Sequence, residues 1–328
     1  MNDTNRILVV VDPAMRQGAA LQRGAAMARL SGAELKLCLF DFNPWIGSYT
    51  DYGLYGDVLA APLKQKAVEQ FIAERMDWLT AEAAALSAQG LRVECEAVWA
   101  PVAHHAVIAK TVEYGANLVI KDLGPQRSLG ALLRPLDWKL LRLLPADLML
   151  VQSDAQPVPR RIAAAVDTWA GPHAPEALNE AIVRSALKWG LYADAEVHLA
   201  HAVPAPPVAG IVSEALRLSH ENKLRMDAET FLGFADAHTV PQERRHLLSG
   251  DASESLADFT RKESIDLLVL GATYRSAWDG FLLGTTAEQL LTLLSCDVLM
   301  VKAPGFPALL RQHLDVDELV RRYAELPA

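Results

Sequence analysis

Arg6-Ile-Leu-Val-Val-Val-Asp12 stands near the start of the chain, and Arg161-Ile-Ala-Ala-Ala-Val-Asp167 repeats its order of residue types. Each stretch has a basic residue, five apolar residues and an aspartate. Two further pairs echo one another in the same order. Asn117-Leu-Val-Ile120 resembles the segment that begins at Asp266, and the apolar run 140–151 resembles the run 290–301. Three matches in one order indicate a duplicated domain.

Within each half, apolar strand-like runs alternate with helical stretches. We expect strands near 6–12, 34–41, 91–98, 117–121 and 147–151, and again near 161–167, 195–203, 243–249, 266–271 and 297–302. In the second half, we expect helices near 175–191, 209–237, 252–263 and 284–294. Buried strands joined by helical crossovers predict a parallel sheet covered on both faces. The predicted fold is α/β, with two tandem doubly wound five-stranded domains, and ligands of such sheets bind beyond the carboxyl ends of the strands.

The chain of 328 residues is long enough for two such domains. We place them at 1–152 and 160–303, joined by a polar, proline-bearing linker at 153–159. The tail 304–328 departs from the repeat, and its stretch 314–323 reads as a short amphipathic helix. We expect this tail to pack on the second domain or on a partner.

Composition excludes several classes of protein. Hydrophobic residues make up 51% and charged residues 22%, which excludes wholesale disorder. The formal net charge is −9, so the chain has no general electrostatic reason to bind nucleic acid or an anionic membrane. Cys38, Cys95 and Cys296 are widely spaced within apolar segments, as reduced buried thiols are. With a polar N-terminus and no apolar run of membrane-spanning length, we expect a soluble cytoplasmic protein.

Two features could bind a ligand in the second half. Asp167 ends the opening strand, where its carboxylate could accept hydrogen bonds from a ligand or could equally cap a turn or helix, and Asp12 has the same two possibilities in the first half. After the apolar run 267–270, Gly271 begins a loop that ends at Gly284-Thr285-Thr286. A helix that starts there offers free amides and hydroxyls to a phosphate, although a threonine could also simply cap the helix.

The loop resembles a known nucleotide signature. Gly-x2-Gly-x9-Gly-[Ser/Thr] after a strand is typical of the universal stress protein family, and Gly271, Gly284 and Thr285 stand at its spacing. The Val-Asp strand openings, the strand ending at 201–203 and the closing segment 296–301 are similar to that family too. The resemblance covers nearly the whole chain twice, as in the family's tandem two-domain branch. It implies a Rossmann-like, adenine nucleotide alpha hydrolase-like fold.

The resemblance also implies roles for particular residues of the second domain. Asp167 with Val166 would take the base and ribose of ATP, Gly271 and Thr273 would line the middle, and Gly284, Thr285 and Thr286 would hold the phosphates, with magnesium as the accompanying ion. One position departs from the signature, because Tyr274 replaces its second glycine. The tyrosine could contact a ligand or fill the pocket.

The first domain is more degenerate. Its corresponding loop begins at Lys121, Arg134 stands where Gly284 stands, and Pro135 replaces Thr285, which removes an amide and a hydroxyl. We expect a structural role there, although Lys121 and Arg134 leave positive charge for an anion. The two domains are expected to pack as an internal pseudo-dimer, and a homodimer of chains remains open.

Other candidate groups are weaker. His104 and His105 are adjacent on a helix, and His198 and His201 face opposite sides of a strand, so neither pair suits one metal ion. The aromatic stretch 40–55 forms a long loop, which could cover the strand ends but is favoured as a domain–domain contact.

The sequence therefore predicts a non-enzymatic, cytoplasmic stress-response protein that binds ATP or a related nucleotide in its second domain and acts as a sensor or interaction module with an unknown protein partner. Two alternatives stay open. One is a slow nucleotide hydrolase at the same pocket, and the other is a pure protein-interaction module with both pockets closed. A dehydrogenase of the Rossmann type is weaker, because no Gly-x-Gly-x-x-Gly follows either opening strand.

Overall fold

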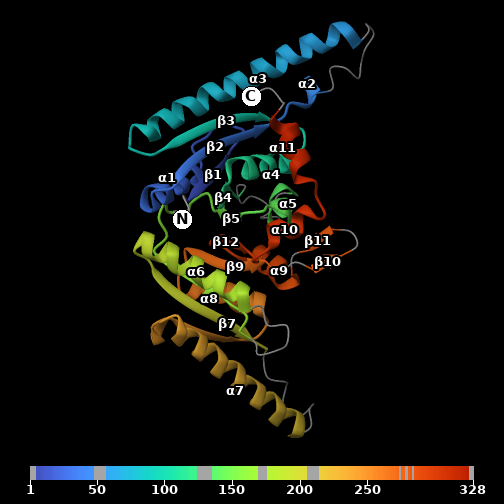
Figure 1. Cartoon of the computed structure of the whole chain (residues 1–328). Coiled ribbons are helices and arrows are strands. Elements are labelled where there is room, and N and C mark those ends of the chain that lie inside the picture. The colour runs from blue at the N-terminus through green and yellow to red at the C-terminus, as the bar shows by residue number, and fades with distance from the viewer. Residues whose placement is uncertain are drawn as a thin grey trace. The chain divides into compact units, whose positions relative to one another are not determined.

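A computed structural model describes residues 5–47, 57–123, 135–168, 176–204, 214–272, 275–277, 280–282 and 284–324. The chain divides into two units. Among the described residues, the first contains those up to 123, those from 135 to 157 and the tail from Pro307 onward, and the second contains those within Val158–Phe306. Figure 1 colours the chain from its N-terminus to its C-terminus.

The first unit is a five-stranded parallel sheet with helical crossovers. Its elements are β1 (Arg6–Val11), α1 (Ala19–Ser31), β2 (Glu34–Asp41), α2 (Pro44–Gly47), α3 (Asp57–Ser87), β3 (Val93–Trp99), α4 (Ala103–Tyr114), β4 (Leu118–Asp122), α5 (Pro135–Leu143) and β5 (Asp147–Val151). The strand order is β3-β2-β1-β4-β5, and each neighbouring pair is parallel. The long helix α3 packs along the edge strand β3 (Figure 1).

The second unit repeats this plan. Its elements are β6 (Arg161–Ala165), α6 (Glu176–Ala193), β7 (Glu196–Val203), α7 (Glu214–Ala237), the 3₁₀ turn η1 (Gln242–Arg244), β8 (Arg245–Ser249), α8 (Ala252–Lys262), β9 (Leu267–Ala272), β10 (Arg275–Ala277), β11 (Gly280–Leu282), α9 (Thr285–Leu293) and β12 (Asp297–Lys302). The parallel order β8-β7-β6-β9-β12 matches that of the first unit, strand for strand. The predicted α/β fold of two tandem doubly wound domains is confirmed.

The strands form the core of each unit because helices cover both of their faces. Leu8 and Val9 of β1 and Leu267 and Leu268 of β9 have no exposed surface. Continuous apolar runs such as these are typical of strands that are buried on both sides. After β9, the sequence predicted only a loop. The structure has a short antiparallel hairpin there, formed by β10 and β11.

The C-terminal tail packs on the first unit, which corrects the expectation that it would pack on the second domain or on a partner. It forms α10 (Phe306–Arg311) and α11 (Val316–Ala324), and α11 packs against α4 (Figure 1). Val316, Leu319 and Tyr323 form the buried stripe of α11. The Tyr323 hydroxyl donates a hydrogen bond of 3.2 Å to the carbonyl oxygen of Val102, just before α4. Amphipathic periodicity identified the helix but did not indicate which surface its apolar stripe would cover.

None of the described helices is both long and apolar enough to cross a membrane.

Candidate functional site

The candidate site of the second unit lies where β6 and β9 end. These strands are parallel neighbours, and Ala164 is in register with Val269. Asp167 and Ala272 each lie three residues further along, so both strands reach the same edge of the sheet together. This is the point at which the strand order reverses, where doubly wound sheets bind ligands. Sequence reasoning placed the candidate residues at this edge on the same grounds.

Buried side chains hold the backbone at the end of β6. The Asn179 side chain on α6 accepts a hydrogen bond from Asp167 N (3.0 Å) and donates one to Asp167 O (2.6 Å). His201 of β7 places its Nδ1 3.0 Å from the carbonyl oxygen of Val166, and its ring stacks on Phe231. Since a carbonyl oxygen only accepts, Nδ1 must carry the proton. The segment that carries Asp167 is therefore fixed from two sides.

This fixed segment presents polar groups at the strand end. The Asp167 side chain is exposed, whereas Thr168, directly after it, is buried. Within the described part of the chain, the Thr168 hydroxyl oxygen is buried and has no hydrogen-bond partner. A buried, unpaired hydroxyl normally requires a partner such as water or a ligand.

The start of α9 offers backbone amides. Gly284 is its N-cap residue and supplies no side-chain cap. The neighbouring helix α8 differs, because the Asp251 carboxylate accepts from the amides of Ser253 and Glu254 at 2.9 and 3.1 Å. The Ser253 hydroxyl lies 3.4 Å from the carbonyl oxygen of Thr286, and α8 packs on α9. The start of α8 thus has an N-cap carboxylate that accepts from its first amides, whereas α9 begins after a glycine and carries Glu288 in its first turn.

The other predicted residues have mixed outcomes. Thr286 is exposed in the first turn of α9, and the backbone of Thr285 begins that helix. Thr273 and Tyr274 lie outside the described residues. At Gly271, a Cβ atom would lie 2.7 Å from side-chain atoms of Leu178 and of Ile182 on α6. This glycine is needed for close helix–strand packing, and its contact with a ligand stays a prediction.

Strand register corrects the alignment of the two halves. Leu118 begins β4 and Leu267 begins β9, and each pairs with the second residue of its unit's opening strand. Asp122 and Gly271 each lie four residues further on, so Asp122 occupies the position of Gly271. The assignment of Lys121 to that position was wrong by one residue, because the connection that follows in the first half is one residue shorter.

Asp122 closes the corresponding site of the first unit. Its Oδ1 accepts a hydrogen bond of 2.7 Å from the amide of Ala20 at the start of α1. A Cβ atom on Gly18 would lie only 2.1 Å from Asp122 Oδ2, so the carboxylate lies directly against that backbone. Burial raises the pKa of Asp122, and the nearby Asp12 carboxylate raises it further. Two acidic side chains therefore share this strand end.

Of the two cations expected at this site, Lys121 is already paired with a carboxylate, and Arg134 lies outside the described residues. Lys121 Nζ forms a buried ion pair of 2.8 Å with Asp137 Oδ1 on α5 and donates to the carbonyl oxygen of Asp122, also at 2.8 Å. Asp137 is fully buried. Pro135 is the first residue of α5 and has no N–H to offer. Asp12 itself accepts from the amide of Ala14 in a turn, which is the structural alternative considered for it.

The remaining candidates behave differently from one another. His198 lies 3.0 Å from His246, whereas His201 contacts Val166, so the two histidines of β7 have separate surroundings, as predicted. Among the described residues, no group of three or more His, Cys, Asp or Glu side chains is placed to hold a metal ion. Cys38 and Cys296 are buried cysteines outside any disulfide, and Cys95 is half-buried. In the aromatic stretch, Trp45 is 84% exposed, and residues 48–56 lie outside the description.

Comparison with known proteins finds a family that matches the second half and relatives that match most of the chain. The family model described as the universal stress protein family matches residues 159–302. Universal stress protein E of Escherichia coli (strain K12) is 26% identical over 311 residues, which cover 90% of this chain and 93% of that protein. Universal stress protein A homolog 1 of Coxiella burnetii is 33% identical over 112 residues, or 33% of this chain and 76% of that protein.

A solved structure shares the fold over almost the whole chain. It is the crystal structure of a functionally unknown protein from Pseudomonas aeruginosa PAO1, 25% identical to this chain, with a TM-score of 0.73. The alignment covers 96% of this chain and 98% of that protein.

Proposed function

The chain belongs to the universal stress protein family, and we propose that its second unit binds ATP with magnesium while its first unit binds no nucleotide. The observation that carries this proposal is the pairing of a fixed Asp167 with an α9 start that has no side-chain cap, at the edge where β6 and β9 end. Exposed carboxylates can accept hydrogen bonds from ribose hydroxyls, and helix amides can donate to phosphate.

The groups at this edge suit a nucleotide chemically. While it is ionised, the Asp167 carboxylate accepts hydrogen bonds and donates none. It therefore belongs at the hydroxyl-bearing end of the ligand. The Thr286 hydroxyl and the first amides of α9 are donors and belong at the phosphates. Thr168 supplies a buried hydroxyl that has no partner in the described part of the chain. The donors and acceptors thus have complementary partners in one ATP molecule.

The first unit offers the opposite electrostatics. Asp12 and Asp122 place two carboxylates at its equivalent edge, and Lys121 is bound to Asp137. Carboxylates repel phosphate, and Pro135 has no backbone N–H to donate to one. We propose that this unit is structural and that the whole chain acts in the stress response as a non-enzymatic sensor or interaction module.

The first experiment is mass spectrometry of any small molecule released when the purified protein is denatured, together with a thermal shift on adding magnesium-ATP. We expect an adenine nucleotide or a clear upward shift. Gly284→Arg should abolish the shift, because the side chain would enter the space in front of the α9 amides. Gly233→Arg is the matched control, since a Cβ atom there meets nothing within 4 Å.

The alternatives give different results in the same experiment. Release of ADP from added ATP, lost in Gly284→Arg, would identify a slow hydrolase. An empty protein with no shift would contradict nucleotide binding and favour an interaction module with a closed pocket.

A further inference from the structure

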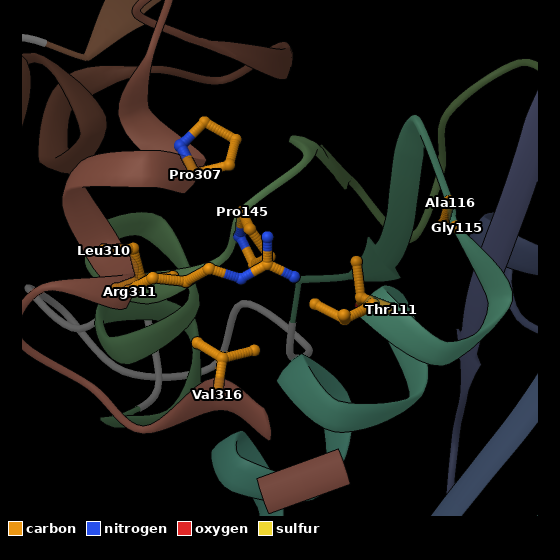
Figure 2. A pocket seen from close by; sticks show the side chains of 9 residues that line it. Thr111, Gly115, Ala116, Pro145, Pro307, Leu310, Arg311 and Val316 are labelled. Carbon is orange, nitrogen blue, oxygen red and sulfur yellow. The ribbon is translucent and has the colours of Figure 1, made fainter. Parts of the chain in front are cut away.

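A separate cavity lies in the first unit, between its body and the C-terminal tail. Its volume is about 200 Å³. Figure 2 shows the side chains that line it. The body contributes the end of α4, including Thr111 and Gly115, and Pro145 before β5. The tail contributes Leu310 and Arg311 of α10 and Val316 at the start of α11. This cavity is formed by residues other than those at the carboxyl ends of the strands.

The lining is mostly apolar, and Arg311 is the charged residue among those that form it. Leu310 and Val316 are almost fully buried. Thr111 is buried too, and its hydroxyl already donates a hydrogen bond of 2.7 Å to the carbonyl oxygen of Val107. The last carbonyls of α4 are also satisfied, because Thr111 O and Val112 O accept from the backbone amides at the turn that follows. These polar groups of the wall therefore already have partners within the protein.

Arg311 is the exception, and its charge is poorly compensated. Its guanidinium extends across the cavity toward α4 (Figure 2). In the part of the chain that the structure describes, its guanidinium pairs with Asp317 at 3.9 Å, and the two side chains are 55% and 75% exposed. An ion pair this long and this exposed contributes little. A guanidinium beside an apolar cavity can form two parallel hydrogen bonds with one carboxylate.

Size and charge together define the ligand. An apolar cavity of about 150 Å³ in another protein is large enough to hold benzene. The present cavity has room for such a ring and one small substituent. We propose that it binds a small aromatic carboxylate, with the ring against the apolar walls and the carboxylate on Arg311.

Binding of a ligand in this cavity would favour the docked position of the tail. Because walls come from both the body and the tail, a bound ligand stabilises the docked tail over the undocked one. The same tail is anchored at the other end of α4 by the Tyr323 hydrogen bond to Val102. Occupancy of the cavity should therefore protect α11 amides from hydrogen exchange.

The test compares benzoate with benzyl alcohol, which has the same ring and no charge, by calorimetry and ligand-observed NMR on the full chain. We expect one benzoate per chain and at least about tenfold weaker binding of the alcohol, since a charged hydrogen bond is lost. Arg311→Gln should remove this preference. Arg321→Gln, on the exposed side of α11, is the matched control and should keep it.

A second variant covers the case in which Arg311→Gln disturbs the tail. Ala116→Leu fills the cavity from the body side without changing charge, and it should abolish binding of both compounds. The proposal is overturned by the absence of benzoate binding at about 10 mM, by equal binding of the two compounds, or by benzoate binding that survives Arg311→Gln or Ala116→Leu unchanged.

Discussion

The carboxyl ends of β1 and β4 in the first unit and of β6 and β9 in the second have the same topology and opposite chemistry. At the first, the Asp122 carboxylate lies on the start of α1 next to Asp12. At the second, Gly271 takes the position of Asp122, and the apolar side chains of α6 fill the space beside it. One fold therefore gives an edge with two carboxylates, one of them bound to a helix amide, in the first unit and an edge that presents the exposed Asp167 side chain in the second.

The difference shows that a duplicated strand edge can change its chemistry without changing its fold. Internal carboxylates occupy the helix amides and the lysine that would otherwise attract an anion, and they also satisfy buried polar groups. The first unit gains structural interactions where the second keeps donors exposed. Variants that exchange residues between equivalent positions test this comparison.

The largest effect is expected from Lys121→Leu. Leucine is the residue at the equivalent position of the second unit, Leu270. The change leaves Asp137 buried without its cation, and loss of one partner of a buried ion pair costs about 3–5 kcal/mol. Hydrogen exchange of the β1 and β4 amides should show faster opening of the first unit, with the β6 and β9 amides unchanged.

The matched control is the double variant Lys121→Leu with Asp137→Ala, which reproduces Leu270 and Ala287 of the second unit. Removing both charges should restore most of the lost stability. If the single and double variants are equally destabilised, the ion pair does not determine stability at this edge.

A smaller effect is expected from Asn179→Leu in the second unit. The change leaves the backbone N–H and carbonyl of Asp167 without their side-chain partner, at a cost of about 1–3 kcal/mol. It should also weaken the thermal shift with magnesium-ATP, because the Asp167 segment is no longer held. Gln17, just before α1 of the first unit, is exposed and donates hydrogen bonds to the Glu82 side chain, so Gln17→Leu should change neither quantity. A full nucleotide shift in Asn179→Leu would show that Asp167 does not depend on this support.

How far the sequence predicted these features depended on the kind of signal. Hydrophobic periodicity and the repeated Val-Asp ends predicted both sheets, because buried parallel strands and their crossovers dominate the pattern. Asn179 was missed, although a polar residue between Leu178 and Ile182 on the buried face of a helix is a readable sign of a buried hydrogen-bond partner. Asp122 and Asp137 were missed because their partners lie far away in the chain, and no local pattern encodes those contacts.

The smallest expected effect is a pH dependence at Asp122. Its pKa is raised in the folded protein by burial and by Asp12, so the folded state holds this proton more tightly than the unfolded state does. Stability from this group is therefore fully present below the ordinary aspartate pKa of about 4 and is lost as pH rises through the folded pKa.

Asp122→Asn keeps an acceptor for the Ala20 amide but carries no charge. Its stability relative to the unchanged protein should rise between pH 4 and pH 7, by less than about 1 kcal/mol because the helix start favours the carboxylate. Urea unfolding across that range measures the difference, and Asp12→Asn should flatten the pH profile of the Asp122 protein. Parallel profiles for the unchanged protein and Asp122→Asn would mean that the two carboxylates do not repel each other, and the acidic edge would no longer support the proposal that the first unit binds no nucleotide.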